Sequence, residues 1–126
     1  MSKFCREAEM TYFEMHEFHC PCCQRAEMDE VFIQQLDHAR KRADTPFHIT
    51  SGYRCKAHNA LVGGRPGSSH TLGKAVDLQA ADSRSRFNIM RGLSMAGFKR
   101  IGLDTKRGFI HVDSDGDKPQ NVLWGY

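Results

Sequence analysis

The sequence predicts an α+β fold in which a small, mostly antiparallel sheet is backed by helices. Two segments, residues 29–43 and 83–96, repeat apolar residues at the spacing of a helix. Short segments around them alternate in polarity with the period of two that is typical of strands. Strands and helices mixed in this order favour a sheet covered by helices.

The bulk properties favour one soluble domain. No repeat, low-complexity segment or linker divides the 126 residues, so we treat residues 1–126 as a single domain. Hydrophobic residues make up 40% of the chain and charged residues 26%, as in ordinary globular proteins. Apolar runs are far shorter than the roughly 20 residues of a membrane helix, so we expect no membrane insertion.

The N-terminal segment, residues 1–28, is expected to be irregular and packed onto the rest of the chain. Its aromatic residues Tyr12, Phe13 and Phe18 are the expected contacts. Residues 1–15 are polar and mixed in charge, without the apolar core of a signal peptide. We therefore expect synthesis in a cytoplasm without export by the usual secretion route.

The elements of the first half follow from apolar spacing and chain breakers. The helix at residues 29–43 has acids near its start and bases near its end, a charge pattern that stabilises a helix through its dipole. Pro46 ends it, and residues 47–51 alternate as in a short strand. A short helix is expected at residues 56–62, and a loop at 65–69.

The second half of the chain is predicted to form three strands and one helix. Residues 75–80 alternate, with Asp77 on the face opposite the apolar residues. A helix follows at residues 83–96, capped by Asp82 or Ser83. Residues 98–103 and 108–113 are strand-like. Trp124 and Tyr126 are expected to seal the core, with covering of a cleft as the alternative.

The segment with the richest chemistry is residues 68–77, which read SSHTLGKAVD. It places His70 on a loop and Asp77 on the next strand, while His111 lies on a later strand. Imidazole and carboxylate bind first-row metals, and three protein ligands with an open position are usual for catalytic zinc. Each residue also has an interpretation as a hydrogen-bonded structural residue, and the spacing alone does not decide between the two.

The pattern Ser-x-His-x-x-Gly-x-Ala-x-Asp, followed by a histidine on a strand, resembles the signature of the zinc D-Ala-D-Ala carboxypeptidase family, peptidase family M15. The fixed positions are matched by Ser68, His70, Gly73, Ala75 and Asp77. Residues 50–54, 59–64 and 109–113 resemble a short, single-domain branch that includes phage endolysins. The resemblance covers roughly residues 16–113 and implies a zinc site in a cleft on the sheet.

The resemblance implies a zinc metallopeptidase, a hydrolase in which one zinc ion on His70, Asp77 and His111 activates water. It implies a catalytic and substrate-binding role for Arg54, which in the family steadies the substrate's carbonyl or carboxylate. A guanidinium suits this role because it is planar, always charged and forms two hydrogen bonds. Ser68 is a candidate substrate-binding residue, or else a cap of its loop.

The general base departs from the family pattern. Better-known relatives carry an acid three positions before the last zinc histidine, and Gly108 stands there in this chain. Asp113 lies two residues after His111 on the same strand face, roughly 7 Å along the strand. We expect Asp113 to act as the catalytic base, with orientation of a ligand histidine as its alternative role. Asp104 and Asp115 are weaker candidates.

The cysteines raise the question of a second, structural zinc. Cys20 and Cys23 have the spacing of half a four-ligand zinc site. No second pair stands at a suitable spacing, so small buried cysteines or a facultative disulfide are the other interpretations. The residues available to complete a site are Cys5, Cys55, His16 and His19.

The expected function is cleavage of peptide bonds in the stem peptides of bacterial peptidoglycan, as a D-Ala-D-Ala carboxypeptidase or as an endopeptidase of the endolysin type. A phage-encoded enzyme would reach the cell wall after release by a holin. We expect a monomer without a nucleic-acid partner, because the net charge is only +3 and the basic clusters at residues 40–42 and 84–86 lack interleaved aromatics. The alternatives are a non-catalytic zinc-binding module, suggested by Gly108, and an adaptor built around the cysteines.

Overall fold

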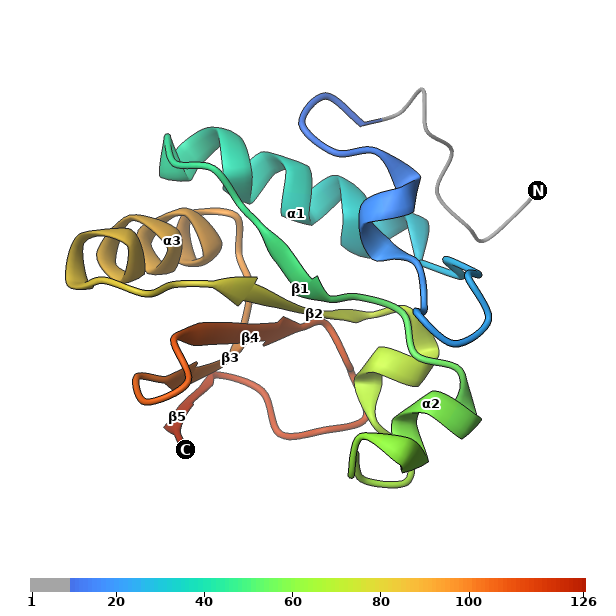
Figure 1. The fold of residues 1–126 in the computed structure, drawn as a ribbon. Coiled ribbons are helices and arrows are strands. Elements are labelled where there is room, and N and C mark those ends of the chain that lie inside the picture. The colour runs from blue at the N-terminus through green and yellow to red at the C-terminus, as the bar shows by residue number, and fades with distance from the viewer. Residues whose placement is uncertain (1–9) are drawn as a thin grey trace.

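The structure is a computed structural model that describes residues 10–126. Within this range, five strands form one sheet in the order β1-β2-β4-β3-β5 (Figure 1). All neighbouring strands are antiparallel except β3 and β5, which are parallel. The elements are the short 3-10 helices η2 (Met15–Phe18) and η3 (Ser69–Leu72), the helices α1 (Glu30–Ala43), α2 (Lys56–Leu61) and α3 (Ser83–Met95), and the strands β1 (Ile49–Ser51), β2 (Ala75–Gln79), β3 (Arg100–Asp104), β4 (Phe109–Asp113) and β5 (Val122–Gly125).

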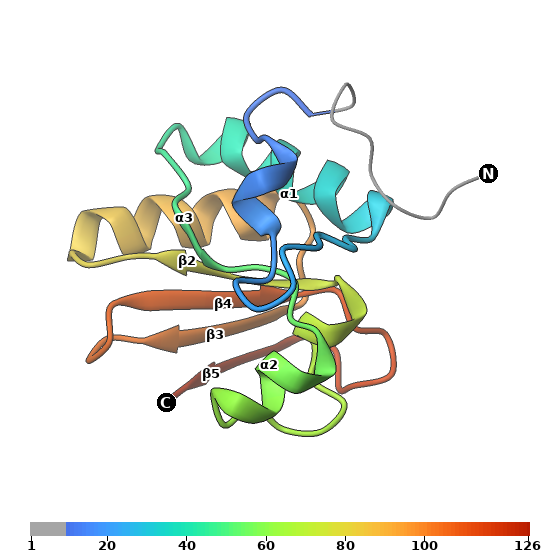
Figure 2. The ribbon, with the colours of Figure 1, turned by 45° about the vertical axis from the view of Figure 1, so that its right-hand side comes forward.

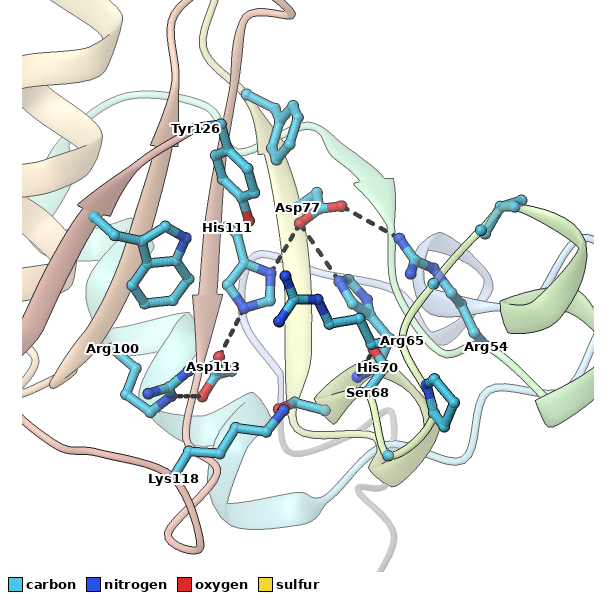
Figure 3. A pocket seen from close by; sticks show the side chains of 18 of the residues that line it. Arg54, Arg65, Ser68, His70, Asp77, Arg100, His111, Asp113, Lys118 and Tyr126 are labelled. Atoms are coloured by element: carbon cyan, nitrogen blue, oxygen red, sulfur yellow. Dashed lines mark hydrogen bonds and ion pairs between the residues drawn. The ribbon is translucent and has the colours of Figure 1, made fainter.

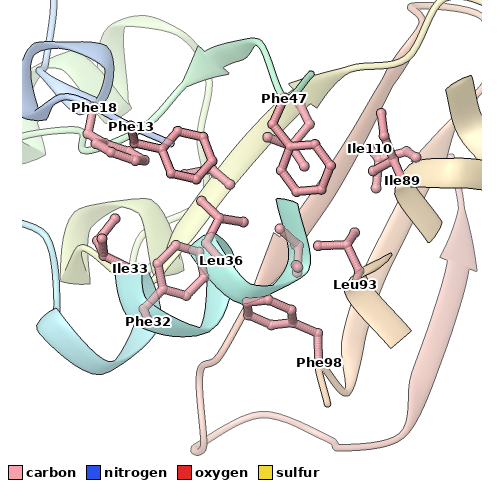
Figure 4. Packing of buried hydrophobic residues seen from close by; sticks show 14 of the residues in the cluster. Phe13, Phe18, Phe32, Ile33, Leu36, Phe47, Ile89, Leu93, Phe98 and Ile110 are labelled. Carbon is pink, nitrogen blue, oxygen red and sulfur yellow. The ribbon is translucent and has the colours of Figure 1, made fainter. Parts of the chain in front are cut away.

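Helices α1 and α3 lie side by side over one face of the sheet (Figures 1 and 2). The apolar residues of the central strands point toward them, and Val76, Leu78, Ile110 and Val112 are all 0% exposed. The core therefore lies between the two helices and the sheet (Figure 4). The helices contribute Phe32, Ile33, Leu36, Ala39, Ala43, Ile89 and Leu93. This arrangement confirms the predicted α+β class with a mostly antiparallel sheet.

Both long helices begin where the sequence predicts. The Asp29 carboxylate accepts the Phe32 amide at 3.0 Å, and the Asp82 carboxylate accepts the Ser85 amide at 2.8 Å. Each bond satisfies one of the amide groups that a helix start leaves without a partner. None of the helices within residues 10–126 is long and apolar enough to cross a membrane.

The described part of the N-terminal segment packs onto the core through two of its three aromatics. Phe13 and Phe18 are buried, with their rings edge to face at 5.5 Å. Tyr12 is instead 41% exposed, beneath the Arg40 guanidinium at 4.7 Å. The segment is also not wholly irregular, because residues 15–18 form η2.

The C-terminal residues correct the predicted core. Strand β5 pairs with β3 at the sheet edge, where its alternate residues remain exposed. Tyr126 is 63% exposed, and both Trp124 and Tyr126 line a cleft. Their preferred assignment to the core is wrong, because both side chains line the cleft on the other face of the sheet, which was the alternative expectation.

Candidate metal centre

The face of the sheet opposite α1 and α3 carries a row of residues across four strands. Asp77 on β2 pairs with His111 on β4, His111 pairs with Gly102 on β3, and Gly102 pairs with Trp124 on β5. Because alternate residues of a strand point to opposite faces, these residues share the face away from the core. The strand register thus places Asp77 beside His111, although 34 positions separate them in the sequence.

His70 reaches the same point from η3, which precedes β2. A sharp turn at Gly73 joins the two elements with a φ of 70°, in the left-handed region. A Cβ atom there would lie 2.0 Å from the Glu27 carbonyl oxygen. Glycine is therefore required at this turn, as the motif predicts, and Ala75, two residues later, is fully buried.

The three predicted metal ligands converge in the structure (Figure 3). Asp77 Oδ1 lies 3.4 Å from His70 Nε2 and 3.1 Å from His111 Nδ1. One ligand atom from each of the three residues lies within 4.8 Å of the other two. Ligand atoms about 2.0–2.1 Å from a tetrahedral ion are about 3.3 Å apart, so these separations fit a shared zinc ion.

The other nitrogen of each imidazole has its own partner. His70 Nδ1 lies 2.8 Å from the carbonyl oxygen of Gly52, to which it donates. His111 Nε2 lies 2.7 Å from Asp113 Oδ2. These partners hold the proton on the outer nitrogen and leave the nitrogen that faces Asp77 free to bind a metal. The donor set and the tautomers thus both fit zinc.

The charges of the site are strongly coupled. Burial by itself raises the pKa of Asp77, but hydrogen bonds and charge interactions with His111 and His70 outweigh it and hold that pKa well below its usual range. Burial lowers the pKa of His111, but its hydrogen bonds to Asp113 and Asp77 outweigh this and raise that pKa above its ordinary value. Without a metal, the site thus stabilises a carboxylate between two imidazoles.

Zinc affinity at this site is expected to fall as the pH is lowered. A metal binds neutral imidazole, so protons compete with it, and the raised pKa of His111 makes this competition start at a higher pH than for an ordinary histidine. The apparent dissociation constant, measured by competition with a chromogenic chelator, should rise from about pH 8 to about pH 6. A constant affinity over that range would contradict this assignment of His111.

Asp113 is held on both oxygens. Its side chain is 1% exposed, Oδ1 accepts from Arg100 Nε at 2.7 Å and from the Asp115 amide at 3.1 Å, and Oδ2 contacts His111. Burial raises its pKa, but the hydrogen bonds from His111, Asp115 and Arg100 outweigh burial and lower it. A carboxylate with a lowered pKa is a weaker base. The contacts therefore favour the orienting role, while the base role stays a prediction.

Arg54 lies beside the candidate ligands. Its Nη2 is 3.6 Å from Asp77 Oδ2, its Nε donates to Ser51 Oγ at 3.1 Å, and its Nη1 donates to Asn59 Oδ1 at 3.3 Å. The side chain is 16% exposed and lines the cleft. The guanidinium is thus held in place next to the candidate metal centre, and its substrate-binding role stays a prediction.

The remaining predicted residues have structural contacts. Ser68 Oγ accepts the His70 amide at 3.3 Å, which is the capping contact, although Ser68 also lines the cleft. Asp115 accepts from Ser69 Oγ at 2.8 Å, and Asp104 accepts the Arg107 amide at 2.8 Å. Neither Asp104 nor Asp115 lines the cleft. Among the described residues that line it, the acids are Asp77 and Asp113.

The cleft around the site has a volume of about 720 Å³ and a cationic lining that the sequence did not reveal. Trp124 lies over Gly102, where a Cβ atom would be 2.6 Å from its ring, and its ring centroid is 5.6 Å from that of His111. The alternation of strand residues could have predicted that Arg100 lies on the cleft face of the sheet. No pattern in the sequence predicts that loop residues also line the cleft. The cations that line the cleft are Arg54, Arg65, Arg100, Arg107 and Lys118.

Comparison with known proteins agrees with this geometry. The family model described as Peptidase M15 matches residues 8–113, which include all three candidate ligands. A search of curated proteins found no match. The match spans most of the chain, from the N-terminal segment to the end of β4. The chain therefore belongs to the peptidase M15 family, which is a family of zinc metallopeptidases.

Proposed function

We propose that this zinc metallopeptidase hydrolyses peptide bonds in the stem peptides of bacterial peptidoglycan. Membership of the family supports the hydrolase and the metal. The observation that carries the proposal is the convergence of His70, Asp77 and His111 at the wall of a cleft lined by cations. Stem peptides carry free carboxylates, which a cationic cleft attracts.

His70 Nε2, His111 Nδ1 and a carboxylate oxygen of Asp77 would hold the zinc ion. A zinc ion bound there would act as a Lewis acid that lowers the pKa of water and polarises a carbonyl. The Gly52 carbonyl and Asp113 fix the two imidazoles in the orientation and tautomer that this requires.

Arg54 is proposed to stabilise the developing oxyanion or the substrate's carboxylate. Its contacts with Ser51 and Asn59 hold the guanidinium before a substrate arrives, so little reorganisation is needed in the reaction. Replacement of Arg54 by alanine should lower kcat/KM roughly 100-fold or more. Replacement by lysine should keep only part of the wild-type kcat/KM, because an ammonium group cannot donate two parallel hydrogen bonds in one plane.

The control for Arg54 is Arg107→Ala, which removes a cation from the cleft at a side chain that is 79% exposed. It should change kcat/KM only slightly. Zinc content and thermal unfolding of each variant show whether the site remains intact. Equal losses in the two variants would contradict a specific role for Arg54.

Asp113→Asn distinguishes the two roles of Asp113. Asparagine can still accept from His111 Nε2 through its amide oxygen but cannot take a proton. If Asp113 orients His111, zinc affinity should fall by roughly 10–100-fold, with kcat largely recovered at saturating zinc. If it is the base, zinc affinity should change little, and kcat should fall by roughly 100-fold or more even at saturating zinc.

The proposal is tested by mass spectrometry of purified muropeptides after incubation with the protein. Loss of a terminal D-alanine indicates a carboxypeptidase, and a cut within the stem or a cross-bridge indicates an endopeptidase. Either product should be absent with a chelator and with His70→Ala. Intact muropeptides, from protein shown to hold zinc at the candidate metal centre, would contradict the proposed substrate.

A non-catalytic zinc-binding module is the second candidate. It is favoured by Gly108 at the position of the family's usual acid and by the engagement of both Asp113 oxygens. Such a module would contain zinc and bind wall fragments without cleaving any peptide. A module would also keep this binding in Asp113→Asn.

A further inference from the structure

Two neighbouring cysteines, Cys20 and Cys23, and the distant Cys55 form a second group of side chains that could hold a metal. The Sγ atoms of Cys20, Cys23 and Cys55 lie within 4.8 Å of one another, and those of Cys20 and Cys55 are 3.7 Å apart. We call these three residues the thiol cluster. None of them lines the cleft of the candidate metal centre. The cluster is thus a separate feature that the proposed peptidase reaction does not use.

The loop from Cys20 to Cys23 is shaped to present two thiols on one side. The Cys20 carbonyl accepts the Gln24 amide at 2.7 Å, and the Cys20 amide donates to the Arg25 carbonyl at 2.7 Å. Gln24 takes a left-handed φ of 59°, which closes the turn. This turn places the Cys20 and Cys23 side chains close enough for their sulfur atoms to share one metal ion.

Cys55 completes the cluster from the residue before α2. Its sulfur accepts the His58 amide at 3.4 Å. The segment that carries Cys55 is docked on the N-terminal segment, because the Tyr53 amide donates to the Phe18 carbonyl at 2.9 Å. Gly52 lies so close that a Cβ atom there would be 2.8 Å from Phe18 Cα. Tertiary packing thus brings Cys55 to the loop, 35 positions away from Cys20.

We propose that the thiolates of Cys20, Cys23 and Cys55 bind a second zinc ion. Sulfur atoms about 2.3 Å from a tetrahedral zinc lie about 3.8 Å apart, close to the separation of Cys20 and Cys55. The donor set is softer than that of the candidate metal centre and favours zinc over magnesium or calcium. The assignment does not depend on the peptidase activity.

The second zinc has a structural role. Cys55 directly follows Arg54, and the Gly52 carbonyl in the same segment holds His70. A metal at the thiol cluster therefore fixes the N-terminal segment to the residues that position the candidate metal centre. Because binding to the folded state stabilises it, removing this ion should lower the melting temperature.

The test measures zinc per chain in protein purified under reducing conditions, together with zinc X-ray absorption. The wild type should contain two zinc ions per chain. Cys20→Ser, Cys23→Ser and Cys55→Ser should each contain one, with nitrogen and oxygen ligands only. His70→Ala should also contain one, with sulfur ligands. Cys22→Ser is the matched control in the same loop and should keep two.

The same measurements can overturn the proposal. One zinc without sulfur ligands in the reduced wild type would do so, and this needs no cysteine variant to fold. Loss of a zinc ion in Cys22→Ser would contradict the three-residue assignment. A Cys20–Cys55 disulfide in the purified protein, found by peptide mapping beside a single zinc, would replace the metal with a covalent link. Absence of activity against muropeptides leaves these outcomes unchanged.

Discussion

Replacing His70 by alanine is expected to remove zinc from the candidate metal centre and to reduce peptidase activity by roughly a thousandfold or more. His70 is 4% exposed, and its Nε2 is one of the two imidazole nitrogens that face Asp77 Oδ1. Lewis-acid catalysis supplies several kcal/mol, and each 1.36 kcal/mol is tenfold in rate. The measurement is kcat/KM on a cleaved muropeptide, with zinc retention followed by competition against a chelator.

The controls separate loss of a ligand from loss of the fold. His48→Ala removes an exposed histidine that does not line the cleft, and it should leave activity and zinc binding unchanged. Asp77→Asn keeps the shape of the side chain but removes its charge, and it should behave like His70→Ala. A folded His70→Ala protein that retains both zinc at the candidate metal centre and wild-type activity would refute the assigned ligand set.

Replacing Arg100 by methionine is expected to cause the largest loss of stability, about 3–5 kcal/mol. Arg100 Nε donates to Asp113 Oδ1 at 2.7 Å, and the Asp113 side chain is only 1% exposed. Arg100 Nη1 also donates to the Pro119 carbonyl at 2.6 Å. Methionine keeps the apolar stem but leaves a buried carboxylate without this cation. Urea unfolding of both proteins with a chelator present measures the free-energy difference.

The stability loss expected for Arg100→Met should depend on pH. Contacts with His111, the Asp115 amide and Arg100 outweigh burial and lower the pKa of folded Asp113. These contacts therefore stabilise the wild type above the ordinary pKa of an aspartate, and the effect is lost as the pH falls through the lowered pKa. The difference between the wild type and Arg100→Met should therefore shrink in acid. Arg107→Ala, which breaks an ion pair at a 79% exposed side chain, should cost under about 0.5 kcal/mol. A similarly small loss in Arg100→Met would show that the buried pair contributes little.

Local signals explain which elements were predicted correctly. The helices at residues 30–43 and 83–95 carry their own start signals and apolar faces, so their bounds depend on nearby residues. Strand β5 has only four residues and half-exposed side chains, so its pairing with β3 depends on packing rather than on its own pattern.

In the candidate metal centre, too, some features depend on nearby residues and others on tertiary packing. Ten residues fixed a turn at Gly73 and placed His70 and Asp77 on either side of it. The partners of Asp113 and the position of Trp124 over Gly102 come from strands that pair across the sheet. No spacing in the sequence encodes these contacts, which is why Trp124 was wrongly assigned to the core.

The sequence by itself predicted the α+β class and the capped helices, because these follow from short-range periodicity and local cap residues. The resemblance to the peptidase M15 signature implied the three candidate zinc ligands. Only the tertiary structure decided that Asp113 contacts His111 and Arg100, that five cations line the cleft, and that Cys55 joins Cys20 and Cys23. The physical reason is that these groups meet through sheet register and loop docking. Both depend on the burial of the whole core, which no local stretch of the chain specifies.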